Sequence, residues 1–222
     1  MRRPEEFVRW CVSFLPDTRP VVEVPRSPAD WNRVFAIATR HGVLPFLYGP
    51  VSHLEGHAVP DAVLQALRQL CILIQVRNQQ ALRTCQSLLA ALRLAGISPL
   101  MLKGVALPAT VYRETPQLRS FVDIDALIRE PDFPQAHAVL TRLGYQAEHE
   151  SLHNPEEVYH WPKYRRPDDL LAIELHYGLV KADTPFQIPL RELWDRARSV
   201  EADGQEMLVC APEDMMLHGA LH

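Results

Sequence analysis

The sequence predicts an α+β protein, in which an α-helical N-terminal region precedes a core of alternating strands and helices. Three observations predict this class. Apolar residues recur at helical spacing through the first hundred residues, the pattern changes to short apolar runs at Ile97, and a two-residue alternation marks a strand at 121–128. The 222 residues suffice for one large domain or two small ones with a real hydrophobic core.

The helical region carries clear boundary signals. Ser27 is a good N-cap, Asp30 lies three residues later, and Gly42 ends the helix that they begin. A second, long helical stretch runs from Asp61 to Ala95, where its apolar positions keep helical spacing. Within it, the polar run 77–80 marks a break or a change of face.

After Ile97 the expected elements are short and alternate in type. In chain order they are a strand at 98–103, a helix to Arg113, a strand at 121–128, a helix at 131–143, two strands at 158–165 and 170–179 joined by a turn at 167–169, a helix at 189–198, a strand at 206–210 and a helix from 212. The paired strands should form a hairpin.

These patterns divide the chain into three parts. Residues 1–96 form a helical N-terminal region, residues 97–211 form the α/β core, and residues 212–222 begin a C-terminal helix. The last part has acidic residues in its first turn but no stop signal, and it ends in mid-pattern. We therefore expect further helices after His222.

The bulk charge argues against one class of partner. The formal net charge is -4, whereas proteins that grip long DNA or RNA usually carry a strong basic excess. We do not expect a nucleic acid partner.

Cysteine usage and hydropathy indicate a cytoplasmic protein. The cysteines are far apart, form no C-x-x-C pair, and are expected to be buried free thiols: Cys11, Cys71, Cys85 and Cys210. This pattern suits a reducing compartment. No convincing signal peptide is present at the N-terminus. No run of about 18 apolar residues is present either, so we expect no membrane span.

The central chemical signal is the pair Asp123 and Asp125. On a strand, residues two apart share one face, so both carboxylates should lie together. Two such groups repel each other unless a cation lies between them, and a hard divalent ion with oxygen ligands is the natural partner. Mg²⁺ bound in this way, with Mn²⁺ as the alternative, is typical of phosphoryl-transfer sites. The alternative interpretation is a pair of solvated aspartates on the wet face of an edge strand.

Two residues upstream suggest a place for phosphate. Lys103 and Gly104 lie at a predicted strand-to-helix junction, where free N–H groups and the positive end of the helix dipole suit an anion. Gly104 allows the backbone to come close, and Lys103 contributes a point charge. An ordinary strand exit is the alternative.

A third carboxylate is available downstream. Glu174 lies between apolar neighbours on a predicted strand, which we expect to be able to pair with the strand of Asp123 and complete the metal site. His176 shares its face with Glu174 and is a candidate substrate contact or support for the metal ligands. An exposed charge and a structural histidine are the alternatives.

Basic residues flank these elements. Arg119 and Ser120 precede the strand of Asp123, and we assign both to nucleotide binding. The basic cluster 163–166 lies at the predicted hairpin tip. We interpret it first as a solvated turn and second as a patch that binds the acceptor.

Together these residues resemble the uncharacterised nucleotidyltransferase family of the DNA polymerase β-like superfamily. The residues that carry the resemblance are 102–107, Tyr112, Arg119, 123–128, Gly144, Tyr145 and 174–176. The resemblance implies a mixed sheet flanked by helices, an Mg²⁺–NTP site, and transfer of a nucleoside monophosphate with loss of pyrophosphate. It also implies that Asp123, Asp125 and Glu174 are catalytic metal ligands and that Lys103 and Gly104 face the nucleotide.

The sequence departs from the superfamily pattern at two positions. Val105 follows Gly104 where a serine is usual, so a hydroxyl that would touch phosphate is missing. Glu174 replaces the more usual aspartate, which lengthens its reach by one methylene. These departures bear on turnover more than on fold.

The leading hypothesis is therefore an Mg²⁺-dependent nucleotidyltransferase that acts on an unknown hydroxyl acceptor, a small molecule or a protein. A catalytically weak nucleotide-binding module with the same fold is the main alternative. A third is an antitoxin-like or scaffold protein, whose N-terminal helices bind a protein partner.

Overall fold

A computed structural model describes residues 3–13, 22–54, 59–119, 121–148, 159–169, 171–181, 184–185, 188–202 and 204–221. By their internal contacts the residues form two compact units. The first comprises Met1–Arg77 with Gln117–Ser120, and the second comprises Asn78–Pro116 with Phe121–His222. The long helix α4 (Asp61–Leu94) contributes residues to both, and the division of the chain falls between Arg77 and Asn78, within its polar run.

The first unit is helical. It contains α1 (Pro4–Val12), α2 (Pro28–Arg40), a 3₁₀ turn (Leu44–Leu47), α3 (Tyr48–Ser52) and the first turns of α4. Ser27 and Asp30 form the expected capping box, because the Ser27 hydroxyl accepts from the Asp30 N–H and the Asp30 carboxylate accepts from the Ser27 N–H. Trp31 and Phe7 meet edge to face at the centre of its apolar core.

The second unit is built on a mixed sheet. Among the described residues its strand order is β3-β4-β5-β2-β1-β7-β6. The strands are β1 (Leu100–Met101), β2 (Asp123–Leu127), β3 (Gln146–Ala147), β4 (Tyr164–Arg165), β5 (Ala172–His176), β6 (Arg198–Ala202) and β7 (Gln205–Val209). The pairs β2–β5 and β1–β7 are parallel and the other pairs are antiparallel. The mixed sheet implied by the resemblance is thus confirmed.

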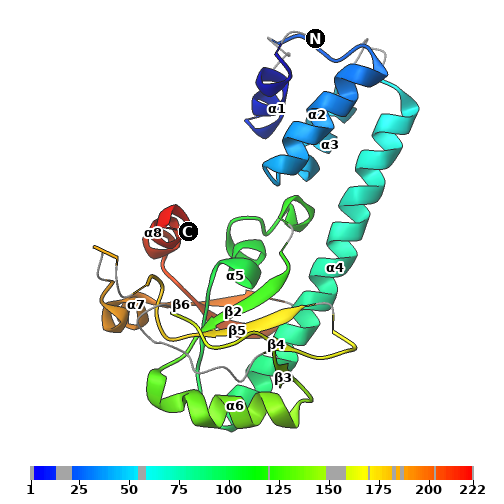
Figure 1. Cartoon of the computed structure of the whole chain (residues 1–222). Helices are drawn as coiled ribbons and strands as arrows, with labels where there is room; N and C mark the ends of the chain where they lie inside the picture. The colour runs from blue at the N-terminus through cyan, green and yellow to red at the C-terminus, as the bar shows by residue number, and fades with distance from the viewer. Residues whose placement is uncertain are drawn as a thin grey trace. The chain divides into compact units, whose positions relative to one another are not determined.

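Helices cover both faces of this sheet. Figure 1 shows α6 (Phe133–Arg142) on one side, and α5 (Lys103–Thr110) and α8 (Pro212–Leu221) on the other. Ile124 and Ala126 from β2 join Ile173 and Leu175 from β5 in the main apolar core, together with buried residues of α4 and α6. The two-residue alternation therefore leaves the opposite face of β2 and β5 to polar side chains.

Several predicted boundaries were wrong. The segment 189–198 is not one helix: α7 (Leu190–Arg196) ends earlier, and Arg198 begins β6. Between 98 and 103 only the two residues of β1 form a strand, and Lys103 already opens α5. The first strand of the predicted hairpin is reduced to β4, with an isolated bridge between His160 and His176. Its pairing with β5 is antiparallel, as predicted.

The thiols are buried and free, as expected from their spacing. No helix within the described ranges combines the length and the apolar character needed to cross a membrane. The division of the chain at residue 96 and the expectation of helices beyond His222 stay predictions.

Candidate metal and nucleotide site

The parallel pairing of β2 with β5 brings three acidic residues to one face of the sheet. Asp125 is the register partner of Glu174, and Asp123 is the partner of Ala172. Because residues two apart on a strand point the same way, Asp123 lies on the same face as Asp125. His176, two residues after Glu174, lies on this face as well.

Three of these side chains form a compact buried cluster. Asp125 is 2% exposed, Glu174 is 7% exposed and His176 is 2% exposed. One ligand atom from each lies within 4.8 Å of the others. Buried charged groups are rare unless they are paired or bind a metal, so this cluster is a candidate binding site for a cation.

His176 supports Asp125 directly. Its Nε2 lies 3.2 Å from Oδ1 of Asp125, a distance at which the imidazole N–H donates to the carboxylate. Burial alone would raise the pKa of Asp125. The hydrogen bond and charge of His176, with the charges of Lys103 and His218, outweigh burial and lower that pKa below its ordinary value. Asp125 is thus held as the ionised partner.

Asp123 has the opposite electrostatic character. It is half-buried, and its pKa is raised by burial first and then by the negative charges of Asp125 and Glu174. Lys163 and Lys103 act against this shift without cancelling it. The Asp123 carboxylate is therefore the member of the pair that would gain most from a bound cation.

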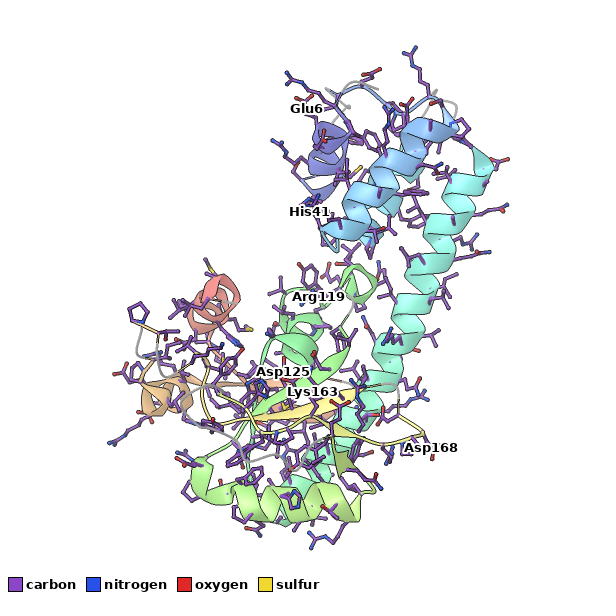
Figure 2. The ribbon with its side chains drawn as sticks, viewed as in Figure 1. Glu6, His41, Arg119, Asp125, Lys163 and Asp168 are labelled. Carbon is purple, nitrogen blue, oxygen red and sulfur yellow. The ribbon has the colours of Figure 1, made fainter. Side chains whose placement is uncertain are left out.

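Glu174 is paired with a lysine that the sequence analysis placed elsewhere. Lys163 Nζ donates to Oε1 of Glu174, so Lys163 is not part of a solvated hairpin tip. Figure 2 shows Lys163 and Asp125 close together at the sheet. The other carboxylate oxygen, Oε2, lies 3.8 Å from His176 Nε2 and 3.9 Å from His160 Nδ1. The hydrogen bond to Glu174, and then the charge of that carboxylate, raise the pKa of Lys163, which keeps the ammonium charged.

The segment before β4 also brings two rings that sequence reasoning missed. Tyr159 and His160 lie with their ring centroids 5.7 Å and 5.4 Å from that of His176. Backbone bonds from Trp161 N–H to Leu175 O and from Tyr177 N–H to Tyr159 O fasten the segment to β5. This segment has no strand-like alternation in its sequence that would predict it, because among the described residues it pairs with β5 through a single isolated bridge.

Helix α5 begins beside the carboxylates. The charge of Lys103 acts on both Asp123 and Asp125. The N-cap residue, Leu102, offers no side-chain cap to the first turn of α5. A Cβ atom on Gly104 would lie 2.9 Å from the carbonyl oxygen of Asp123, so glycine is needed here for contact between α5 and β2. Glycine at position 104 is therefore required for packing, in addition to the close approach of phosphate that the sequence predicts.

Two residues assigned to nucleotide binding lie outside the described part of the second unit. Arg119 belongs to the first compact unit, whereas the carboxylates belong to the second. Ser120 lies outside the described residues. Their contribution to nucleotide binding stays a prediction.

The residues present fit a divalent cation. Oδ2 of Asp125 is buried without a hydrogen-bond partner in the described part of the chain. A buried carboxylate oxygen without a donor is costly, and a metal ion satisfies it. With Asp123 and Glu174 on the same face, the donor set is rich in carboxylate oxygen, which suits Mg²⁺ and Mn²⁺. His176 lies at the edge of this set, where it donates to Asp125.

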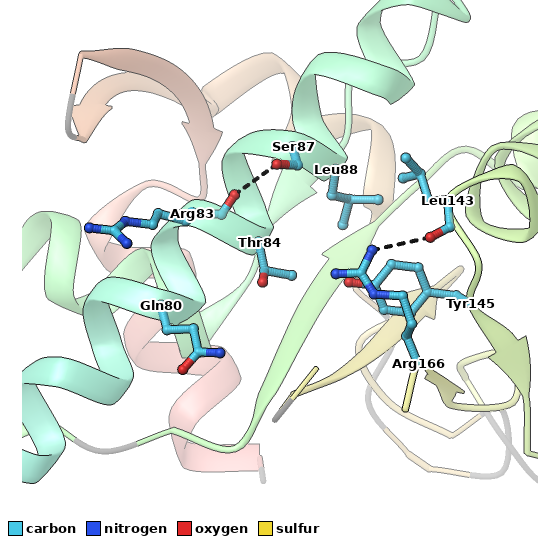
Figure 3. A pocket seen from close by; sticks show the side chains of 8 residues that line it. All are labelled: Gln80, Arg83, Thr84, Ser87, Leu88, Leu143, Tyr145 and Arg166. Carbon is cyan, nitrogen blue, oxygen red and sulfur yellow. Dashed lines mark hydrogen bonds between the residues drawn. The ribbon is translucent and has the colours of Figure 1, made fainter. Parts of the chain in front are cut away.

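A cavity of about 250 Å³ lies elsewhere in the same unit, where α4 meets the residues after α6 and after β4 (Figure 3). Arg166 donates to the Leu143 carbonyl at 3.1 Å, and its guanidinium lies 4.8 Å over the Tyr145 ring. Asp169 accepts from Tyr145 and, at 3.2 Å, from Thr84. These hydrogen bonds join α4 to the residues after α6 and after β4, so we assign the named groups a structural role.

Known proteins similar to this chain include one solved structure and the members of one sequence family. A crystal structure described as a "putative nucleotidyltransferase (TM1012) from Thermotoga maritima" is 13% identical in sequence, with a TM-score of 0.48. The match covers 64% of this chain and 84% of the chain in that crystal structure. A search of curated protein sequences gave no significant match. The model of one protein family, described as "uncharacterised nucleotidyltransferase", matches residues 27–222. Because that match spans most of the sequence, the chain belongs to the uncharacterised nucleotidyltransferase family.

Proposed function

We propose that this protein transfers a nucleoside monophosphate from an NTP to a hydroxyl group of a small molecule or a protein, in a reaction that depends on Mg²⁺ or, alternatively, Mn²⁺. The observation that carries the proposal is the register of β2 against β5, in which Glu174 lies opposite Asp125. That register adds a third carboxylate to the pair Asp123 and Asp125 on one face of the sheet. Family membership supports the same reaction class.

Each residue has a part that follows from its position. Asp123, Asp125 and Glu174 would hold the cation, and His176 would keep Asp125 oriented through the 3.2 Å hydrogen bond. When bound, the ion would stabilise negative charge on the transferred phosphate and on the leaving pyrophosphate. Lys103 and the first N–H groups of α5 would bind the triphosphate, because a helix N-terminus favours anions.

A second candidate function is a binding module without transfer chemistry. The observation in its favour is Val105, which follows Gly104 and supplies no hydroxyl to a phosphate. Partner binding through the N-terminal helices is also supported by apolar side chains exposed along α4 of the first unit, at Ile72, Leu73 and Val76. Cytoplasmic location stays a prediction in either case.

Calorimetric titration tests whether the site binds an NTP with Mg²⁺, which both candidate functions require. Each of the four NTPs is titrated with and without Mg²⁺ into the wild type and into the double variant Asp123→Ala, Asp125→Ala. Mg²⁺-dependent binding that disappears in the folded double variant supports the metal site. Pyrophosphate release with a pool of hydroxyl acceptors then supports transfer, and tight binding without release supports the module. A well-folded wild type that binds no NTP overturns both.

A further inference from the structure

Lys163 brings a positive charge to the three carboxylates of the site. Its ammonium donates to Oε1 of Glu174, and it also attracts Asp123 and Asp125 across the site. One positive charge thus faces all three carboxylates. The side chain is 40% exposed, so a substrate can approach it. The N–H of Glu148 donates to the Lys163 carbonyl at 2.8 Å, which fixes the backbone just before β4.

Sites that use two divalent ions place them about 3.5–4 Å apart and need carboxylate oxygens for both. Here one oxygen of the third carboxylate is already taken, because Oε1 of Glu174 accepts from Lys163. The second oxygen, Oε2, faces His176 and remains available to an ion beside Asp125. The described carboxylates therefore leave ligands for one ion and give the second position to an ammonium.

We propose that Lys163 replaces a second divalent cation, so that the site holds a single metal ion, with Asp123, Asp125 and the second oxygen of Glu174 as its ligands. The inference rests on the proposed function and names how its metal site is completed. An ammonium is a compact point charge that suits phosphate as well as carboxylate. Lys163 thus supplies, next to the transferred phosphate, positive charge that requires no dissolved ion.

The test counts Mn²⁺ ions by electron paramagnetic resonance. The full chain is saturated with a mixture of the four α,β-methylene NTP analogues, which cannot undergo transfer, and Mn²⁺ is titrated in. The variant Lys163→Met removes the positive charge at this position, and Lys163→Arg keeps it. Arg165→Met is the matched control. It removes a cation from the same segment, but Arg165 pairs with Glu148 and not with Glu174. Near-ultraviolet circular dichroism confirms that each variant is folded.

We expect one magnetically isolated Mn²⁺ in the wild type, in Lys163→Arg and in Arg165→Met, and a spin-coupled pair of ions in Lys163→Met. A coupled pair in the wild type overturns the inference but leaves the proposed function standing. A single ion in folded Lys163→Met also overturns it, since Lys163 would then only stabilise the fold. Absence of bound Mn²⁺ from the wild type removes the proposed metal site itself, and the inference falls with it.

Discussion

The Nε2 atom of His176 lies 3.2 Å from Oδ1 of Asp125, and both side chains are almost completely buried. The two residues come from neighbouring parallel strands, 51 positions apart in sequence. Oδ1 accepts this hydrogen bond, whereas Oδ2 of Asp125 has no donor among the described residues. Oδ2 is therefore the oxygen that a ligand can bind. This arrangement of a histidine behind a carboxylate fixes the orientation of the group that we assign to the metal.

The first prediction concerns His176. His176→Leu removes the donor, and we expect Mn²⁺ affinity to fall by roughly 10- to 100-fold, the usual cost of losing a partner that orients a metal ligand. His176→Gln keeps an N–H at a similar distance from the backbone and should retain most of the affinity. Calorimetric titration of Mn²⁺ measures both. Equal, severe losses in the two variants would indicate that the imidazole nitrogen itself binds the ion.

The second prediction concerns Asp123 and pH. Its folded-state pKa is raised by burial and by neighbouring negative charge, so the protonated form stabilises the metal-free fold. That stability is present below the unfolded pKa, about 3.9, and is lost as pH rises through the folded pKa. At pH 7 in EDTA we therefore expect Asp123→Asn to melt at a higher temperature than the wild type.

The difference in melting temperature between the wild type and Asp123→Asn should shrink as pH falls through the folded-state pKa of Asp123, because the wild type then also carries a neutral group at position 123. Saturating Mg²⁺ should reverse the order at pH 7, since only the wild type can bind the ion with this carboxylate. Thermal melts at several pH values, with EDTA and with Mg²⁺, check this. A variant that melts below the wild type in EDTA at pH 7 would refute it.

The third prediction concerns Gly104. In Gly104→Ala the new Cβ would meet the Asp123 carbonyl oxygen at 2.9 Å, and a backbone atom cannot move aside cheaply. We expect a loss of about 1–3 kcal/mol in the free energy of unfolding, as for other overpacked sites. Gly219→Ala on α8 is the matched control, because nothing lies within 4 Å of its added Cβ. Urea unfolding of both variants is the measurement, and equal stabilities would contradict the close contact.

Sequence reasoning located the parts of the site that depend on local pattern. The alternation of Ile124 and Ala126 with Asp123 and Asp125 predicted which face of β2 is polar, and the core contains the two apolar residues. The capping signals at Ser27 and Asp30 predicted the start of α2. In each case one short segment contains all the physical information that is needed.

What could not be predicted depends on contacts between distant segments. Lys163 reaches Glu174 only because the chain before β4 runs beside β5, and no local pattern in 159–163 requires that path. Strand β6 was missed for a different reason. Three of its five residues are exposed, and two of these, Arg198 and Glu201, are charged. An Asp-Gly pair at 203–204 is nevertheless a strong hairpin signal, and Gly204 has a φ of 76°.

The last prediction concerns the thiols. Burial raises the pKa of Cys85 to about 12, that of Cys11 to about 12 and that of Cys210 to about 11. Only the thiolate reacts with disulfide reagents, so these groups should stay almost unreactive at pH 8 while the protein is folded. We expect slow modification by Ellman's reagent in buffer and rapid modification of all four cysteines in guanidinium chloride. Cys71 is buried but is the most exposed of the four thiols, at 7%, so it should react first among them. Replacement of Cys71 by serine should then remove the fastest phase. A fast phase that persists in Cys71→Ser would show that another thiol, and the core around it, opens readily to solvent.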